Sequence, residues 1–256
     1  MTSRDDGSAG DVNYGAIGHG YATYRRPDPH IAARIMTALG EARWVLNVGA
    51  GAGSYEPRDR IVTAVEPSAT MRAQRPPDLP AAIDAVAENL PFADREFDAA
   101  MATVTVHQWR DLAAGISELR RVTTGPIVIL TADPDRLFDY WLYEYFPEPL
   151  AIEQRRFPPI SRLVELLGPT TVVEAVDVPL TCTDGFSEAY YGRPEMLLDA
   201  GARGAMSSYT LVEPGIIAAS VARLRADLDS GAWDERHGHL RTQPFFRGSL
   251  RLVIRQ

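Results

Sequence analysis

A run of apolar residues that breaks into alternating glycines constrains this chain more than any other feature. Residues 44–55 read Trp-Val-Leu-Asn-Val-Gly-Ala-Gly-Ala-Gly-Ser-Tyr. The valines and the leucine suit a strand that is covered on both faces, as in a parallel sheet. The glycines, at every second position from Gly49 to Gly53, allow the backbone to approach a ligand without interference from Cβ atoms. The stretch predicts a buried strand and a nucleotide-binding turn, although such a turn can also be a plain tight connection.

Further apolar runs follow at the spacing of alternating strands and helices. Strands are predicted over 61–66, 82–92, 97–104, 126–132, 171–176 and 249–255, and helices over 30–41, 112–122, 160–167 and 214–229. Apolar residues recur with a helical period in the helical segments, and Asp111 is a candidate N-cap. The alternation predicts an α/β fold with a parallel sheet, whose ligands bind at the carboxyl ends of the strands.

Composition narrows the class of partner. A net charge of -8 argues against nucleic acid and against anionic membranes as partners, because both attract basic proteins. The chain contains no lysine, which excludes Schiff-base chemistry and a Walker A phosphate loop. The single cysteine, Cys182, allows no internal disulfide. We expect a cytoplasmic monomer or homodimer without a signal peptide or membrane anchor, which acts on a small molecule.

An acidic residue ends the second predicted strand. Glu66 occupies the position at which βαβ nucleotide folds bind the two ribose hydroxyls. Gly49, Gly51 and Glu66 could therefore serve an NAD-dependent oxidoreductase. The third glycine of that fingerprint, however, would fall at Ser54, which weakens this alternative.

Taken in order, these motifs resemble those of class I S-adenosylmethionine-dependent methyltransferases of the small-molecule, ubiquinone-biosynthesis-like (type 11) group. The resemblance covers residues 14–132 and rests on the glycine turn, Glu66 and Ala-Glu-Asn-Leu-Pro-Phe at 87–92. It implies a Rossmann-like, doubly wound, mostly parallel seven-stranded sheet with an antiparallel last strand and helical cap insertions. The implied cofactor is S-adenosylmethionine. The residues expected to bind it are Tyr14, Tyr24, Asn47, Gly49, Ala50, Gly51, Gly53, Glu66, Pro67, Ser68, Met71, Ala87, Glu88 and Thr103.

Two positions depart from the pattern of the resembling family. Asn47 stands where the family commonly has Asp or Glu, and an amide cannot offer a full charge to the ammonium group of the cofactor. Val86 and Ala87 replace a frequent Gly-Asp pair, which leaves Glu88 and backbone amides to contact the adenine.

The segment that follows the predicted strand at 97–104 lies where this family places the acceptor. His107 is the candidate general base, because imidazole titrates near neutral pH, although it could instead only shape the wall of the cofactor site. Metal-dependent relatives place an acid where this chain has Thr103, so we expect metal-independent transfer. His237 and His239 lack a third ligand and are interpreted as loop residues.

The expected organisation is a disordered tail over residues 1–12 and a single methyltransferase domain over 13–256. Residues 13–132 form the cofactor-binding half, and 133–160 and 181–246 are expected to cap the acceptor site. The candidate substrate-binding residues are Trp109, Phe138, Trp141 and Tyr145. The last three belong to an aromatic cluster that could line an acceptor pocket, pack a lid, or do both.

The sequence therefore predicts transfer of a methyl group to an O, N or C nucleophile of a small metabolite. A methyltransferase-like fold that serves as a non-methylating cyclase or as a cofactor-binding module remains the alternative from another class.

Overall fold

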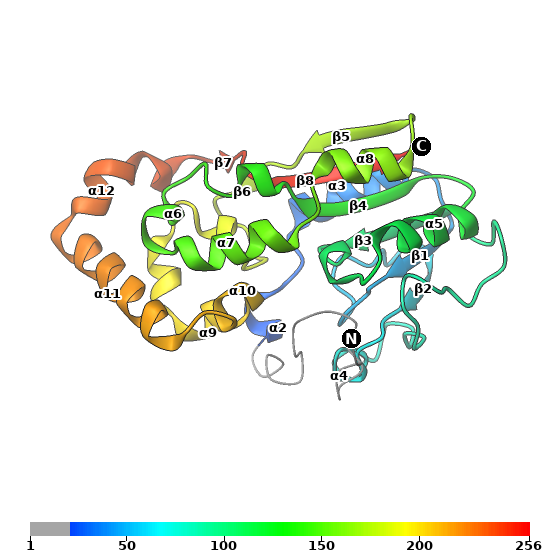
Figure 1. Cartoon of the computed structure of the whole chain (residues 1–256), viewed down its shortest axis with the longest axis horizontal. Coiled ribbons are helices and arrows are strands. Elements are labelled where there is room, and N and C mark those ends of the chain that lie inside the picture. The colour runs from blue at the N-terminus through cyan, green and yellow to red at the C-terminus, as the bar shows by residue number, and fades with distance from the viewer. Residues whose placement is uncertain (1–20) are drawn as a thin grey trace.

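The computed structural model describes residues 21–256, in which a central sheet lies beside a group of short helices (Figure 1). Tyr14 and the tail over 1–12 lie outside the described residues. Six strands form the sheet, in the order β2-β1-β3-β4-β8-β5. Their bounds are Trp44–Val48 for β1, Ile61–Val65 for β2, Ala99–Thr103 for β3, Ile127–Ala132 for β4, Thr171–Ala175 for β5 and Leu250–Arg255 for β8. Strands β1 to β4 are parallel, and β8 is antiparallel to both of its neighbours. This confirms the predicted Rossmann-like sheet with an antiparallel last strand.

The sheet has six strands where seven were predicted, because the segment 82–92 does not form a full strand. It makes one parallel bridge, between Ile83 and Val65, with the Ile83 N–H donating to the Ala64 carbonyl at 2.8 Å. Pro80 lies just before this bridge and has no N–H to extend the ladder. The expected seventh strand is therefore reduced to a single point of contact at the edge of the sheet.

Helices cover both faces of the sheet. Helix α3 (Pro29–Leu39) packs its buried isoleucine and leucine residues on one face, while α5 (Leu112–Val122) and α8 (Ile160–Leu167) pack on the other. Asp28 caps α3 by accepting from two backbone N–H groups, and Asp111 caps α5 as predicted. The short helix α4 (Ala69–Ala73) follows β2 and is capped by Ser68.

A second group of elements lies beyond the end of the sheet at which the parallel strands finish (Figure 1). Its helices are α2 (Tyr21–Tyr24), α6 (Leu142–Tyr145), α7 (Pro147–Arg156), α9 (Ala200–Gly204), α10 (Ser207–Thr210), α11 (Pro214–Ser230) and α12 (Ala232–His237). The small strands β6 (Val178–Pro179) and β7 (Phe245–Phe246) pair with each other. Within residues 21–256, the short 3₁₀ helices are η1 (Val106–Gln108), η2 (Pro134–Arg136), η3 (Ser187–Tyr190), η4 (Pro194–Leu198) and η5 (Gly238–Thr242). No helix within residues 21–256 is both long enough and apolar enough to cross a membrane.

The predicted aromatic cluster packs the interior of this second group. The Trp141 ring meets the Trp233 ring edge-on at 5.3 Å, and its Nε1–H donates to the Tyr191 carbonyl at 2.7 Å. The Tyr145 hydroxyl donates to Asp227 at 2.7 Å. Phe138 contacts Tyr143 edge-on, with ring centroids 5.0 Å apart. The cluster thus joins the helices of the second group to one another and to the sheet.

Candidate cofactor and acceptor site

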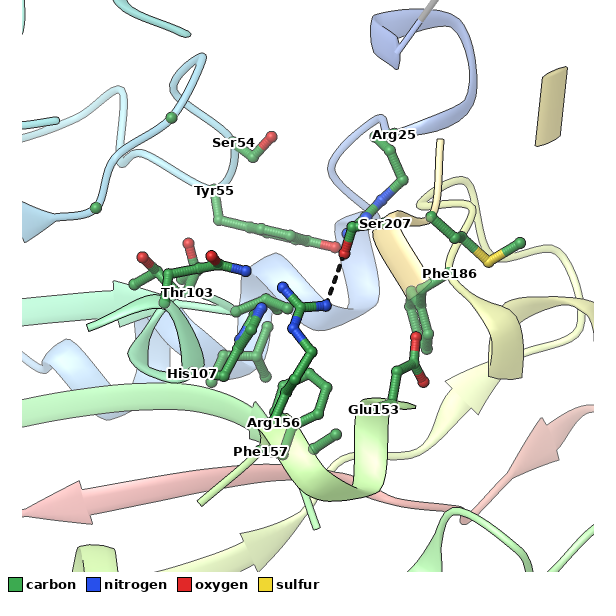
Figure 2. A pocket seen from close by; sticks show the side chains of 18 of the residues that line it. Arg25, Ser54, Tyr55, Thr103, His107, Glu153, Arg156, Phe157, Phe186 and Ser207 are labelled. Atoms are coloured by element: carbon green, nitrogen blue, oxygen red, sulfur yellow. Dashed lines mark hydrogen bonds between the residues drawn. The ribbon is translucent and has the colours of Figure 1, made fainter. Parts of the chain in front are cut away.

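A cavity lies between the carboxyl ends of the parallel strands and the second group of elements (Figure 2). One wall consists of the turns that follow β1, β2 and β3, including Gly49, Glu66 and Thr103. The other wall comes from segments after β4, and we call it the distal chamber. It comprises Leu137, Tyr140, Leu150, Glu153, Arg156, Phe157, Phe186, Ser187, Glu188, Ala205, Met206 and Ser207. The two walls belong to one continuous cavity.

The glycine turn after β1 requires glycine for two physical reasons. Gly49 and Gly51 have φ angles of +70° and +52°, in the left-handed region. A Cβ at Gly49 would also lie 2.1 Å from the Thr105 Oγ1 atom, far inside contact distance. Gly49 and Ala50 both donate their N–H groups to the Val65 carbonyl. The turn is therefore fixed to the end of β2 and lies against the segment that follows β3.

Glu66 is held at the end of β2 by backbone donors. Its side chain is buried, its Oε2 accepts from the Gly51 N–H at 2.8 Å, and its Oε1 accepts from the Ser68 N–H at 2.8 Å. Burial raises the pKa of Glu66, while the two backbone donors oppose that rise. Each carboxylate oxygen keeps a further lone pair, so the group can accept from two hydroxyls of a ligand.

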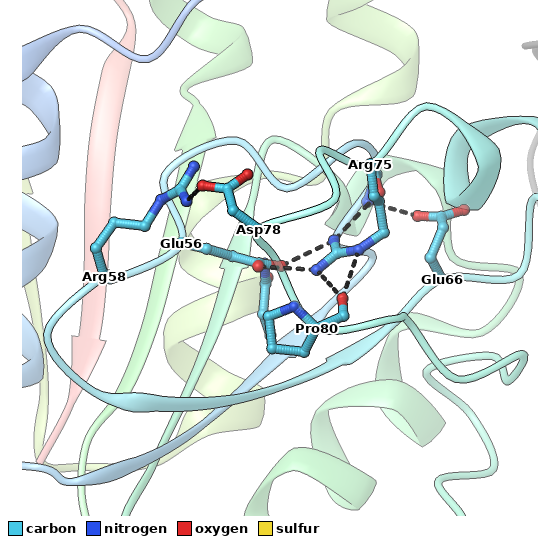
Figure 3. Close-up of polar contacts among 8 residues, drawn as sticks. Glu56, Arg58, Glu66, Arg75, Asp78 and Pro80 are labelled. Atoms are coloured by element: carbon cyan, nitrogen blue, oxygen red, sulfur yellow. Dashed lines mark hydrogen bonds and ion pairs between the residues drawn. The ribbon is translucent and has the colours of Figure 1, made fainter.

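Two of the cofactor residues predicted at the glycine turn, Asn47 and Gly53, lie outside the lining of the cavity. The Asn47 Nδ2 donates to Glu56 Oε1 at 3.0 Å, and Glu56 forms a bidentate ion pair with Arg75 at 2.8 and 2.9 Å. Arg75 also donates to the Pro80 carbonyl (Figure 3). Asn47 thus belongs to a buried network beneath the turn, and a Cβ at Gly53 would meet Leu79 at 2.2 Å. Both residues support the turn from behind.

The loop after the Ile83 bridge contributes Ala87 and Glu88 to the cavity wall. Glu88 Oε1 accepts from the backbone N–H groups of Arg110 at 2.6 Å and Asp111 at 3.0 Å. This carboxylate therefore ties its loop to the segment that follows β3, in addition to facing the cavity. Trp109 also lines the cavity.

His107 lies in η1 and faces the cavity beside Arg156 and Phe157 (Figure 2). Its ring centroid is 4.4 Å from that of Phe157, and its buried Nδ1 atom has no hydrogen-bond partner. Burial, together with the positive charges of Arg156 and Arg25, lowers the pKa of His107 to about 3. The imidazole is therefore neutral throughout the physiological range.

Most of the predicted site residues line the cavity, but four aromatic ones do not. Pro67, Ser68, Met71 and the other predicted turn residues line the cavity, Asn47 and Gly53 excepted. Tyr24 does not line it, because its hydroxyl donates to Asp199 at 2.7 Å. Phe138, Trp141 and Tyr145 are not brought to the cavity either, since they pack the second group. Their role in binding the substrate therefore stays a prediction.

Sequence reasoning missed the residues that do form the distal chamber. Tyr140 lies within the predicted aromatic cluster, but nothing in the pattern distinguishes its ring from those of its neighbours. Glu153 and Glu188 come from α7 and η3, and are separated by a long stretch of chain. Nothing in the local sequence singles out Glu153, which stands beside other charged and polar residues of α7.

Comparison with known proteins agrees with the geometry. The profile of the methyltransferase domain family (type 11) matches residues 46–125, which hold the glycine turn, Glu66 and Glu88. A solved structure from Anabaena variabilis, described as a methyltransferase from an antibiotic biosynthesis pathway, superposes with a TM-score of 0.86. Its sequence is 28% identical, and the match covers 91% of this chain and 99% of that chain. Together, these matches support a class I S-adenosylmethionine-dependent methyltransferase of the type 11 group.

More distant structures share the fold of this methyltransferase. One from Bacillus halodurans has a TM-score of 0.52 at 15% identity, and the match covers 87% of this chain and 96% of that chain. Another, from Methanococcus maripaludis, has a TM-score of 0.50 at 17% identity and covers 69% and 92%. Among curated proteins, none matches the sequence.

The residues present in the cavity fit the cofactor of this enzyme class, which is S-adenosylmethionine. The turn at Gly49 and Gly51 keeps side chains out of the space beside β1, and the Glu66 carboxylate has free lone pairs at the end of β2.

Proposed function

We propose that this methyltransferase acts on an O, N or C nucleophile of a small molecule and needs no metal ion. The observation that carries the proposal is the continuity of the cofactor wall with the distal chamber. Aromatic and aliphatic side chains dominate that chamber, and they suit a compact, partly apolar acceptor. The acidic net charge favours such an acceptor over a nucleic acid.

The residues that would hold the cofactor follow from the cavity wall. The Glu66 carboxylate would accept from the ribose hydroxyls, and the backbone of the turn from Gly49 to Gly51 would contact the methionine portion. Ala87 and Glu88 would border the adenine. When bound, S-adenosylmethionine supplies an activated methyl group on a sulfonium.

The chain itself would align the acceptor with the methyl group, exclude water, and accept the proton that the acceptor loses. The elements after β4 close one side of the cavity and would hold the attacking atom in line with the methyl group. His107 remains the candidate general base. Its neutral imidazole and unpartnered Nδ1 suit the acceptance of a hydrogen bond from an attacking O–H or N–H group.

Two measurements test this function. Calorimetric titration with S-adenosylhomocysteine should show stoichiometric binding, and binding of neither this product nor S-adenosylmethionine would refute the assignment. Incubation with methyl-labelled S-adenosylmethionine and a panel of small amines, phenols and acids should then give an acceptor heavier by one methylene unit. A fluorescence change on titration with NADH would instead support the dinucleotide alternative.

A further inference from the structure

Two side chains in the distal chamber, Glu188 and Tyr140, each have a buried oxygen atom without a hydrogen-bond partner. Glu188 is 3% exposed, and while its Oε1 accepts from the Ser249 N–H at 2.6 Å, its Oε2 has no partner. Tyr140 is 8% exposed, and its hydroxyl has no partner either. Both residues line the cavity. Buried polar atoms in proteins are nearly always paired, so two such atoms in one cavity wall indicate a polar group of a ligand.

The charges around this wall favour a cationic group. Glu153, from α7, also lines the cavity, and its Oε1 accepts from the Ser208 hydroxyl at 2.8 Å. Across residues 21–256, neither Glu153 nor Glu188 forms an ion pair within 4.0 Å. Burial, with the nearby Glu153 charge, raises the pKa of Glu188 to about 7, against the lowering by the backbone and side-chain groups of Ser249 and the attraction of Arg251. A ligand cation would relieve this repulsion between two buried carboxylates.

The arginines of the cavity do not remove this preference. Arg25, which lines the cavity, is paired with Asp184 at 2.5 Å. Arg251, which does not line it, is paired with Asp133 at 3.4 Å. Arg156 donates to the Ser207 hydroxyl at 3.0 Å and lies next to His107 (Figure 2). With Arg156 counted against Glu153 and Glu188, the cavity-lining charges of the distal chamber leave a formal excess of one negative charge when both acids are ionised.

We propose that the distal chamber selects acceptors that carry a basic nitrogen, whose ammonium group donates hydrogen bonds to Glu188 Oε2 and to the Tyr140 hydroxyl. The proposal rests on the small-molecule methyl transfer proposed above and narrows its acceptor class. The rings of Tyr140 and Phe186 also line the cavity and supply apolar, cation-attracting surface to it. A neutral hydroxyl would satisfy the hydrogen bonds without the charge, and an anion would be repelled.

Three probes of similar shape and different charge test the selectivity. Protein saturated with S-adenosylhomocysteine is titrated with 2-phenylethylamine, 2-phenylethanol and phenylacetate, and binding is measured by ligand-observed NMR. The amine should bind about tenfold more tightly than the alcohol, because a hydrogen bond between charged groups is stronger than a neutral one. Phenylacetate should bind most weakly. Equal affinities, tighter binding of phenylacetate, or no binding of the amine at millimolar concentration would overturn the proposal.

Variants assign the preference to the two residues. Glu188→Gln should reduce amine affinity to that of the alcohol, and Tyr140→Phe should weaken both probes severalfold. Glu148→Gln, which removes an exposed carboxylate from the same helix as Glu153, is the matched control and should leave the preference intact. Retention of the amine preference in Glu188→Gln would refute the assignment. Circular dichroism checks that each variant folds. If Glu188→Gln does not fold, the affinities of the two probes for Tyr140→Phe test the proposed site instead.

The pH dependence separates recognition from a structural role. Amine affinity in the wild type should rise as pH increases through the pKa of Glu188, because only the carboxylate attracts the ammonium; Glu188→Gln should show no such rise. Loss of S-adenosylhomocysteine binding would count against the proposed function. Intact binding of that product, without amine preference, would remove only this inference.

Discussion

Asn47→Asp is the substitution that most directly tests the buried network beneath the glycine turn. Asn47 is fully buried and donates to Glu56 Oε1 at 3.0 Å. Aspartate has nearly the same shape but would place a second carboxylate at that distance. Arg75 cannot neutralise both, because its guanidinium already forms a bidentate pair with Glu56. One of the two carboxylates must therefore keep a proton.

The cost follows from the pH at which an aspartate ordinarily ionises. An unperturbed Asp has a pKa of about 3.9, so holding it protonated at pH 7 costs about 4 kcal/mol, and at pH 5 about 1.5 kcal/mol. The folded-state pKa is raised above the unfolded value, so the stability of the variant is fully present below about pH 4 and declines as pH rises. The protonated acid can donate to Glu56 in place of the amide, so little else changes.

Urea unfolding of the wild type and of Asn47→Asp at three pH values between 5 and 7 measures this effect. The difference in unfolding free energy should grow by about 1.4 kcal/mol per pH unit. Asn89→Asp adds the same charge at an exposed position and is the control. A difference that does not change with pH, or that equals the control, would refute the placement of Asn47 against Glu56.

Three further predictions follow from the site. His107→Phe should lower kcat by about a hundredfold if the imidazole is the base, which initial rates measure. Between pH 6.5 and 5 the wild type should lose about 1.4 kcal/mol of unfolding free energy for each unit by which the pH falls, because only its unfolded state takes up the proton. Urea unfolding should show no such loss in His107→Phe. Glu188→Gln should remove a loss of about 3 kcal/mol that the wild type undergoes as pH rises from 4.5 through 7, which the same unfolding series detects, and a wild type without this loss would contradict the burial of the carboxylate. Gly49→Ala should cost about 2 kcal/mol or more and weaken S-adenosylhomocysteine binding, whereas Gly204→Ala, with open space at its Cβ, should do neither; thermal melts and calorimetry compare the two.

Much of the sheet and one wall of the cavity follow from local patterns. Continuous apolar runs such as Ile127–Ala132 can form only buried strands in this context, and glycines directly after β1 need positive φ angles. Because parallel strands end at the same edge, Gly49, Glu66 and Thr103 are brought together by topology alone. The extent of the edge segment at Ile83 could not be predicted from the sequence, because a single bridge and a full strand have similar sequence patterns.

The distal chamber was decided by tertiary structure. Tyr140 faces the cavity while its neighbour Trp141 packs against Trp233, and the aromatic pattern is the same for both. Glu188 reaches the chamber because the backbone of Ser249, at the start of β8, binds one of its oxygens. Asn47 likewise looks like a ligand contact in sequence and turns away because Glu56 folds beneath the turn. The sequence determined which strands and turns meet, since that depends on local burial and backbone conformation. The direction of each side chain, and hence the acceptor chemistry, depends on contacts between distant segments.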